Sequence, residues 1–149
     1  MHLICAVDRI TLAMPVAAVV RALPMVAFTP LPETPDFVIG AINLGGSPLP
    51  LIDMRRYMFY KEAVPAPDDK ILVIDLVGRQ VGIVVDTTSG VQAIDPAAIL
   101  SAEAIAPGAR RLSAIGAASV ELMLIYDPAT FLSGDEQARI VAALEKFGP

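Results

Sequence analysis

The chain has few of the residues from which catalytic and redox sites are built. Its 149 residues include one cysteine, Cys5, and one histidine, His2. A single cysteine excludes an internal disulfide and any CxxC metal or redox motif, and no zinc-ligand spacing is present. His2 lies at a terminus, where chains fray, so a Ser-His-Asp or Cys-His arrangement is disfavoured. With no P-loop and no GxGxxG, we expect neither an enzyme nor a bound cofactor or metal.

Long apolar runs and clustered positive charge are also scarce. The longest uncharged run, Phe37 to Ile52, is broken by glycines and prolines and is shorter than the roughly 20 apolar residues of a membrane helix. The N-terminus has no basic start and reaches Asp8 after a short apolar patch, so it is no secretory signal. A net charge of −5 disfavours nucleic-acid binding. We expect a cytoplasmic protein without direct membrane insertion and without a nucleic-acid partner.

Aliphatic residues dominate what is present. The apolar fraction is 55%, the aromatic fraction only 5%, and the mean hydropathy is +0.63. Alanine, valine, isoleucine and leucine must therefore fill the core, and some apolar surface is expected outside it. We favour a partner interface as the explanation. The alternative is that alanine alone raises the mean hydropathy.

One pattern occurs three times: an apolar strand, a small-residue turn, and a second apolar strand that ends in aspartate. The three segments are Ile39 to Asp53, Ile71 to Asp86 and Leu112 to Asp127. The pattern predicts β-hairpins, with a type I′ turn at Gly45-Gly46 and a type II′ turn that begins at Gly78.

The first third of the chain outside the hairpins is expected to hold two strands and an extended connection. Leu3 to Val7 and Ile10 to Met14 read as paired strands. Val16 to Leu23 has apolar residues at helical spacing but is rich in β-branched residues, so the sequence does not decide between helix and strand. The mixture suggests a helical turn that runs into a strand. The four prolines of Pro24 to Pro35 predict an extended segment without regular pairing.

Farther along, loops and two helices are expected. Tyr57 to Tyr60 reads as a strand end or loop, and Glu62 to Asp69 as a polar linker. Asp95-Pro96 predicts the start of a short helix that ends before Pro107. A capping box at Ser133 predicts a terminal helix whose apolar stripe packs on the domain, with partner binding as the alternative; the stripe comprises Ile140, Val141, Leu144 and Phe147.

The three aspartates that end the hairpins are the remaining candidates for chemistry. Asp53, Asp86 and Asp127 could form an acid/base pair or a hard-metal site. Aspartate at a strand exit more often accepts hydrogen bonds from the N–H groups of a turn, and we favour that structural role. Together these patterns predict a small all-β protein of barrel type.

Several of these segments resemble the CheW family of chemotaxis coupling proteins. Pro32 to Leu44 is similar to the approach to that family's central hairpin, and Gly46 to Arg55 to its G-x-x-x-P-h-h-D-h-R run, where h is apolar. Gln80 to Asp86 and Leu122 to Leu132 resemble two further strands of the family, in the same order and spacing.

The resemblance implies two five-stranded SH3-like β-barrels that share a core, in one CheW-like domain over residues 1–149. It implies a non-catalytic adaptor that links the tips of methyl-accepting chemoreceptors to the regulatory domain of a CheA-type histidine kinase, with membrane association only through receptor arrays. The alternative from another class is a small-molecule-binding β-barrel sensor with a roomy apolar pocket.

Two positions depart from the family pattern. Gly45 stands where members often have arginine, and Arg21 stands where they commonly have an acidic residue. These departures suggest an alternative or auxiliary chemosensory system. We expect Arg55 to form an exposed ion pair, so that Arg55→Glu and Arg21→Glu weaken partner binding while the melting temperature stays nearly unchanged. The expected partner-binding residues are Val20, Arg21, Gly40, Asn43, Gly45, Asp53 and Arg55.

Overall fold

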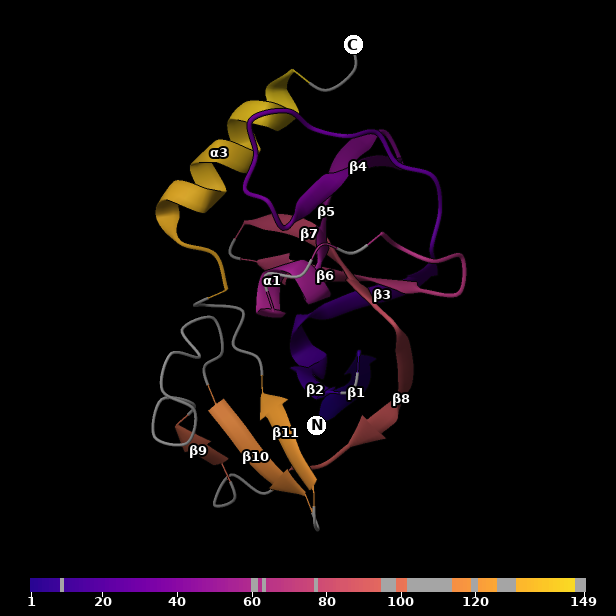
Figure 1. The fold of residues 1–149 in the computed structure, drawn as a ribbon, viewed down its shortest axis with the longest axis vertical. Helices are drawn as coiled ribbons and strands as arrows, with labels where there is room; N and C mark the ends of the chain where they lie inside the picture. Colours follow the sequence, from indigo (N-terminus) through magenta and orange to yellow (C-terminus); the bar gives the residue numbers. More distant parts are fainter. Residues whose placement is uncertain are drawn as a thin grey trace.

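The computed structural model describes residues 1–8, 10–59, 62, 64–76, 78–94, 99–101, 114–118, 121–125 and 131–146. Two mixed, mainly antiparallel β-sheets form the body of the molecule, one above the other (Figure 1). The expected all-β class and the C-terminal helix are confirmed. One sheet has five strands as expected, whereas the other has six.

The six-stranded sheet has the order β8-β1-β2-β11-β10-β9. The first two strands form the expected N-terminal hairpin, in which Val7 pairs with Ile10. The third hairpin predicted from the sequence is the pair β10 and β11. The strands of this sheet are β1 (His2–Val7), β2 (Ile10–Pro15), β8 (Thr87–Gln92), β9 (Ile99–Ser101), β10 (Ala114–Ala118) and β11 (Glu121–Ile125).

The five-stranded sheet has the order β3-β6-β7-β5-β4 and holds the other two hairpins. Gly45 and Gly46 connect β4 to β5 with φ of 61° and 91°, as a type I′ turn requires at both central positions. The strands are β3 (Val19–Pro24), β4 (Val38–Leu44), β5 (Ser47–Asp53), β6 (Lys70–Leu76) and β7 (Arg79–Val85).

The second hairpin differs from the prediction by one residue. Arg79 already belongs to β7 and pairs with Leu76, so Gly78, with φ of 77°, ends the turn and does not begin it. Glycine also accepts positive φ at the second central position of a turn, which is why a single glycine did not fix the register.

Pro50 occupies an interior strand, where the absence of its N–H is tolerated for a specific reason. Its partner on β4 is Ala41, whose N–H and C=O both bond Thr29 on the other side. The Ala41–Pro50 pair therefore exchanges no hydrogen bonds, and the pairing of β5 with β7 begins only at Leu51. After Pro24, which ends β3 and pairs with Lys70, the bridge to Thr29 is the one regular pairing in the described proline-rich segment.

Three helical segments complete the described structure. A short 3₁₀ helix (Val16–Ala18) runs into β3, as the mixed pattern of that segment suggested. The helix α1 (Met54–Phe59) occupies the start of the region expected to be a strand end or loop, so that expectation was wrong. The helix α3 (Gly134–Glu145) begins at the predicted Ser133 capping box. The helix expected at Asp95-Pro96 lies outside the described residues.

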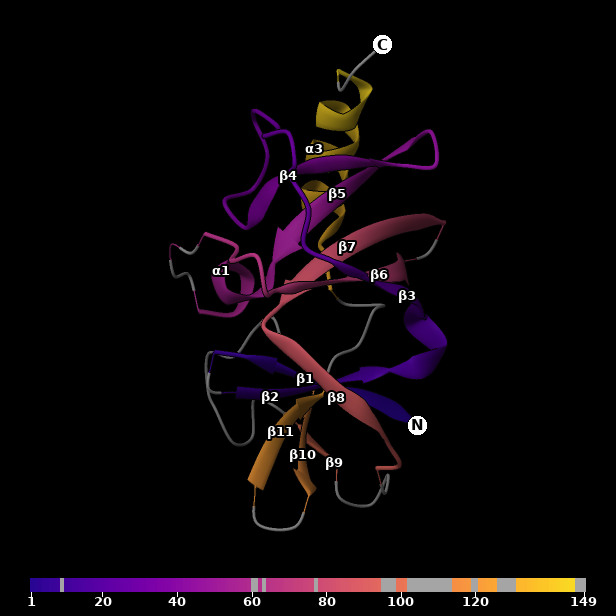
Figure 2. The ribbon, with the colours of Figure 1, turned by 90° about the vertical axis from the view of Figure 1, so that its right-hand side faces the viewer.

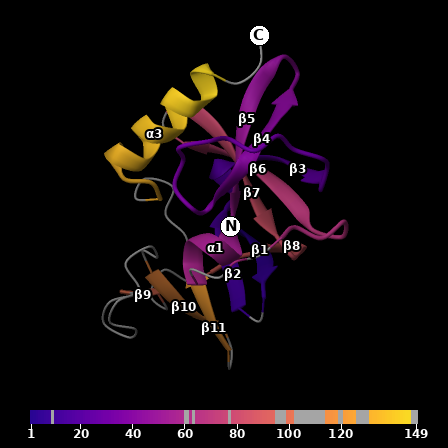
Figure 3. The same ribbon diagram turned by 45° about the horizontal axis from the view of Figure 1, so that its top comes forward.

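Two hydrophobic clusters lie on the two faces of the five-stranded sheet. One cluster, which includes Ile39, Leu51 and Val73, is formed by residues of that sheet alone and lies on one of its faces. The larger cluster lies between the two sheets and includes Leu12 and Ile74. Ile140 and Leu144 of α3 are buried in the larger cluster, which confirms that the terminal helix packs on the domain; Figure 3 shows α3 beside the five-stranded sheet.

An aromatic stack fixes α1 against this core. Tyr57 is fully buried, and its ring lies edge-on to Phe37 and Phe131, with centroid distances of 5.2 and 4.5 Å. Its hydroxyl donates to the backbone carbonyl of Phe131. The tyrosine therefore satisfies its polar atom while it joins the segment before α3 to α1.

Candidate functional site

Six of the seven predicted partner-binding residues fall into three separate places in the structure, and the seventh, Gly40, lies within β4. Val20 and Arg21 lie on β3, at one edge of the five-stranded sheet. Asn43 and Gly45 lie at the β4–β5 turn, and three strands separate β4 from β3 in the sheet order. Asp53 and Arg55 lie in a buried polar cluster, as described below.

The edge strand β3 presents an apolar surface with one positive charge. Val20 is 45% exposed, and Val16 and Val26 at either end of the strand are 38% and 46% exposed. Arg21 is also exposed. A bulge between Val19 and Arg21 interrupts the pairing with β6 at this point, which leaves an extra residue to turn outward. We call Val16, Val20, Arg21 and Val26 the β3 surface.

The β4–β5 turn is exposed and is closed by a side-chain hydrogen bond. The side-chain Oδ1 of Asn43 accepts a hydrogen bond of 2.8 Å from the backbone N–H of Gly46. A Cβ at Gly45 would meet nothing within 4 Å, so the position faces open space. Asn43 therefore has a structural role in the turn, and Gly45 offers no side chain for contact.

An open hollow of about 400 Å³ lies between the tips of the β4–β5 and β6–β7 hairpins. Leu44 and Leu49 contribute its apolar lining, and Ser47 and Arg79 are polar. The hollow opens to solvent and is not the enclosed apolar pocket that a small-molecule sensor would need.

Gly40 has a packing role. It is buried, and a Cβ at this position would lie 2.4 Å from the backbone oxygen of Thr29 and 2.7 Å from the Phe28 ring. Only glycine lets the segment with Thr29 approach β4 closely enough to form its bridge with Ala41. The position therefore requires a residue without a Cβ.

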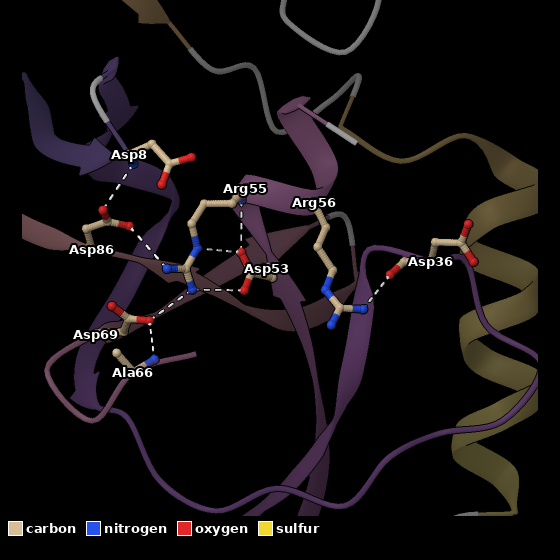
Figure 4. A network of polar contacts seen from close by, with 8 residues as sticks. All are labelled: Asp8, Asp36, Asp53, Arg55, Arg56, Ala66, Asp69 and Asp86. Carbon is tan, nitrogen blue, oxygen red and sulfur yellow. Dashed lines mark hydrogen bonds and ion pairs between the residues drawn. The ribbon is translucent and has the colours of Figure 1, made fainter. Parts of the chain in front are cut away.

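Arg55 is buried, which corrects the expectation of an exposed ion pair. The residue is 9% exposed, and Asp53 is fully buried. The Arg55 guanidinium donates from Nε and Nη2 to the two carboxylate oxygens of Asp53, at 3.1 and 3.0 Å. Nη2 also donates to Oδ2 of Asp69 at 2.9 Å (Figure 4). Such a bidentate, charge-assisted arrangement fixes the planar guanidinium in one orientation.

A third carboxylate, that of Asp86, approaches the same guanidinium from the other side. Its Oδ1 lies 3.8 Å from Nη1 of Arg55, while its Oδ2 accepts a hydrogen bond of 3.1 Å from the backbone N–H of Asp8. We call Arg55, Asp53, Asp69 and Asp86 the Arg55 cluster. Its three carboxylates face one guanidinium, so the cluster has a net negative charge when all groups are ionised.

The electrostatics of the cluster follow from this arrangement. Hydrogen bonding to Asp53 raises the pKa of Arg55 against an opposing effect of burial, so the guanidinium stays charged. Burial raises the pKa of Asp86, and the nearby Arg55 charge only partly offsets it. The cluster is arranged as a structural ion pair network, because its carboxylates face one guanidinium that remains charged at neutral pH.

The expected role of the strand-exit aspartates holds in part. Asp53 accepts a hydrogen bond of 2.9 Å from the backbone N–H of Arg55 in the turn that follows it, as predicted. Asp86 accepts instead from Asp8, in the turn between two other strands. Asp127 lies outside the described residues.

Asp69 is the member of the cluster that the sequence did not reveal. It was expected within a polar linker, yet it is buried, and its Oδ2 accepts both from Arg55 and, at 2.8 Å, from the N–H of Ala66. Its position directly before an apolar strand was the only available signal. Nothing local to Asp69 indicates a partner 14 residues away.

The single cysteine, Cys5, is buried on β1. Burial raises the pKa of the Cys5 thiol to about 12, which keeps it protonated and unreactive. Within the described ranges, the structure contains no helix long and apolar enough to span a membrane.

Comparison with known proteins gives consistent matches. The model of the CheW-like domain matches residues 2–136. A "Chemotaxis protein CheW" from Rhizobium meliloti is 33% identical over 65% of this chain and 63% of its own length. A "Chemotaxis protein CheW" from Klebsiella aerogenes is 31% identical over 75% of this chain and 69% of its own length. "Protein FrzA" of Myxococcus xanthus is 33% identical over 63% of this chain and 59% of its own length.

A solved structure shows the same fold. The scaffolding protein TtCheW from Thermoanaerobacter tengcongensis superposes with a TM-score of 0.79 over 91% of this chain and 93% of its own, at 20% identity. In sequence, the matched part of the chain spans somewhat less than two thirds of the length of the Rhizobium and Myxococcus relatives. None of these comparisons supports a small-molecule sensor.

Proposed function

Because the chain belongs to the CheW-like domain family, we propose that it is a non-catalytic adaptor that couples methyl-accepting chemoreceptors to a CheA-type histidine kinase. The observation that carries the proposal is the family match over residues 2–136, together with relatives named as chemotaxis proteins. The proposal places the protein in the cytoplasm, associated with the membrane only through receptor arrays. It also treats residues 1–149 as one CheW-like domain.

We assign partner contact to the β3 surface rather than to the Arg55 cluster. The β3 surface offers apolar area and a charge for orientation, since Val20 and Arg21 lie on the edge strand and the exposed Val16 and Val26 lie beyond its two ends. An edge strand can pair with an added strand, and an apolar face can accept an amphipathic helix. Asp53 and Arg55 have little surface left for a partner, so their burial supports a role in the fold.

Arg21 and Gly45 support a system with altered partner specificity. An exposed arginine where relatives commonly have an acidic residue would attract a carboxylate and repel a cation, so it also excludes partners that fit the usual charge. The open space around Gly45 leaves the turn without a side chain for a bidentate contact. Both features affect recognition without disturbing the core.

The proposal is tested by measuring binding of the purified protein to receptor tips and kinase regulatory domains from its own genome. Arg21→Glu is expected to weaken binding to at least one partner while the melting temperature stays within experimental error of the unmodified protein. Arg139→Glu is the matched control, since Arg139 is exposed on α3, away from β3. Failure to bind any of these partners would refute the adaptor function. Equal weakening by both variants would refute the assignment to the β3 surface.

A further inference from the structure

Asp86 is the one residue between two strands that belong to different sheets. The strand β7 ends at Val85 in the five-stranded sheet, and β8 begins at Thr87 in the six-stranded sheet. Figure 2 shows the chain crossing from one sheet to the other at this point. The other described crossing is longer, since the 3₁₀ helix Val16–Ala18 separates β2 from β3. A change in the angle between the sheets would therefore be spread over fewer residues at Asp86 than at the other described crossing.

Both sheets hold Asp86. From the six-stranded sheet, the backbone N–H of Asp8 donates to its Oδ2 at 3.1 Å, and the Asp86 N–H donates to the carbonyl of Ala6 at 2.9 Å. On the side of the five-stranded sheet, the guanidinium of Arg55 faces its Oδ1 (Figure 4); Arg55 lies in α1 and is bonded to Asp53 at the end of β5. The carboxylate thus joins a turn of one sheet to a side chain anchored in the other.

These two contacts differ in strength. The distance of 3.8 Å between Oδ1 and Arg55 Nη1 exceeds that of a hydrogen bond, and this buried oxygen has no hydrogen-bond partner among the described residues. Arg55 meanwhile keeps bonds of 2.9 to 3.1 Å to Asp53 and Asp69. A small movement of one sheet would therefore change the Asp86–Arg55 contact first and leave the other bonds of the cluster intact.

The contacts of the Asp86 carboxylate with Asp8 and Arg55 add little to the free energy of unfolding. Burial raises the pKa of its carboxyl more than the Arg55 charge lowers it, so the ionised form is held at a net cost. An apolar residue at this junction would avoid that cost but would give no directional contact to either sheet. The geometry therefore suits a side chain that positions the two sheets relative to each other more than one that stabilises the fold.

We infer that Asp86 is a positioning residue that sets the angle between the two sheets, through its simultaneous contacts with the Asp8 turn and with Arg55. The inference goes beyond the adaptor function and does not depend on any partner. It concerns the distribution of inter-sheet angles in the isolated protein.

The test measures the distance between the sheets in the full chain with paired spin labels. Ser47→Cys on β5 and Gln92→Cys on β8 supply the labelling sites, since both residues are exposed and lie in different sheets. Cys5 is buried, and its raised thiol pKa keeps it from competing for the label. Distances are recorded for the doubly labelled protein and for the same protein with Asp86→Ala, Asp86→Asn or Asp75→Asn.

The expected result is a graded loss of order. Asp86→Ala removes both contacts and should broaden and shift the distance distribution. Asp86→Asn keeps an acceptor for the Asp8 N–H and loses the charge toward Arg55, so it should give a smaller broadening. Asp75→Asn changes an exposed aspartate of the five-stranded sheet and should leave the distribution unchanged.

Circular dichroism and melting temperature are measured on every variant, so that a general loss of structure is recognised. If Asp86→Ala does not fold, Asp86→Asn carries the comparison with Asp75→Asn. A folded Asp86 variant whose distance distribution matches that of the unmodified protein would overturn the inference. So would equal broadening by Asp75→Asn.

Discussion

Replacing Arg55 with methionine is expected to lower the free energy of unfolding by about 3 kcal/mol, the low end of the cost of breaking a buried ion pair. Methionine keeps an unbranched apolar side chain in the space of the arginine stem but removes the guanidinium. Asp53, which is fully buried, would then keep its negative charge without a counter-ion. The penalty comes chiefly from that stranded charge rather than from the lost attraction.

The low end of the range follows from the bonds that survive. The backbone N–H of residue 55 still donates to Asp53 Oδ1, and the N–H of Ala66 still donates to Asp69 Oδ2. Asp53 Oδ2 loses the Nη2 donor, the partner described for it in the structure. Each carboxylate is therefore left with partial compensation instead of none.

Urea unfolding followed by circular dichroism measures this loss, with the slope checked to show that the unfolded surface is unchanged. Arg21→Met is the matched control, because Arg21 is exposed and the same substitution there should change stability by less than about 0.5 kcal/mol. Adding Asp53→Asn to Arg55→Met removes the stranded charge and should recover part of the lost stability. The burial of Arg55 likewise reverses the expectation for Arg55→Glu, which should now lower the melting temperature sharply.

A loss below about 1 kcal/mol for Arg55→Met would match an exposed ion pair and would refute the reasoning. A double variant less stable than Arg55→Met alone would also refute it, because the penalty would then not arise from the charge of Asp53.

Three further predictions concern packing, capping and pH. Gly40→Ala should cost more than about 1 kcal/mol in urea unfolding, since its Cβ would meet the Thr29 backbone at 2.4 Å; a neutral result would contradict the close approach. Ser133→Ala should cost about 1 kcal/mol by removing the N-cap of α3, measurable as a lower melting temperature. The raised pKa of Asp86 means that the native state binds a proton at this carboxyl more tightly than the unfolded state does. The contribution of Asp86 to the free energy of unfolding therefore declines as the pH rises from the ordinary pKa of 3.8 through the raised value. The stability of the unmodified protein relative to Asp86→Asn should fall over that interval, and a rise would contradict the sign.

The hairpins could be predicted because their signals are local. Gly45 and Gly46 satisfy a turn that demands two positive φ values, and the apolar runs on either side of it supply the two strands. The Ser133 capping box likewise contains its own evidence within four residues. The helix α1 was missed because Met54 to Phe59 is too short for helical periodicity, and its burial depends on Phe37 and Phe131.

The Arg55 cluster shows where local inference fails. The run from Asp53 to Arg55 reads as an exposed ion pair, because two neighbouring charges of opposite sign are usually found on the surface. What buries them is the approach of Asp69 and Asp86 from two other segments, which makes a desolvated guanidinium tolerable. The same run that carries the family resemblance therefore contributes to the core between the sheets. For this reason we propose that recognition rests on residues whose substitution costs the fold little. The β3 surface meets that condition, since Val20 and Arg21 are exposed on an edge strand and Val16 and Val26 are exposed beyond its ends. Under this proposal, substitutions at Arg21 and Gly45 would change the partners while the residues that hold the two sheets together stay the same.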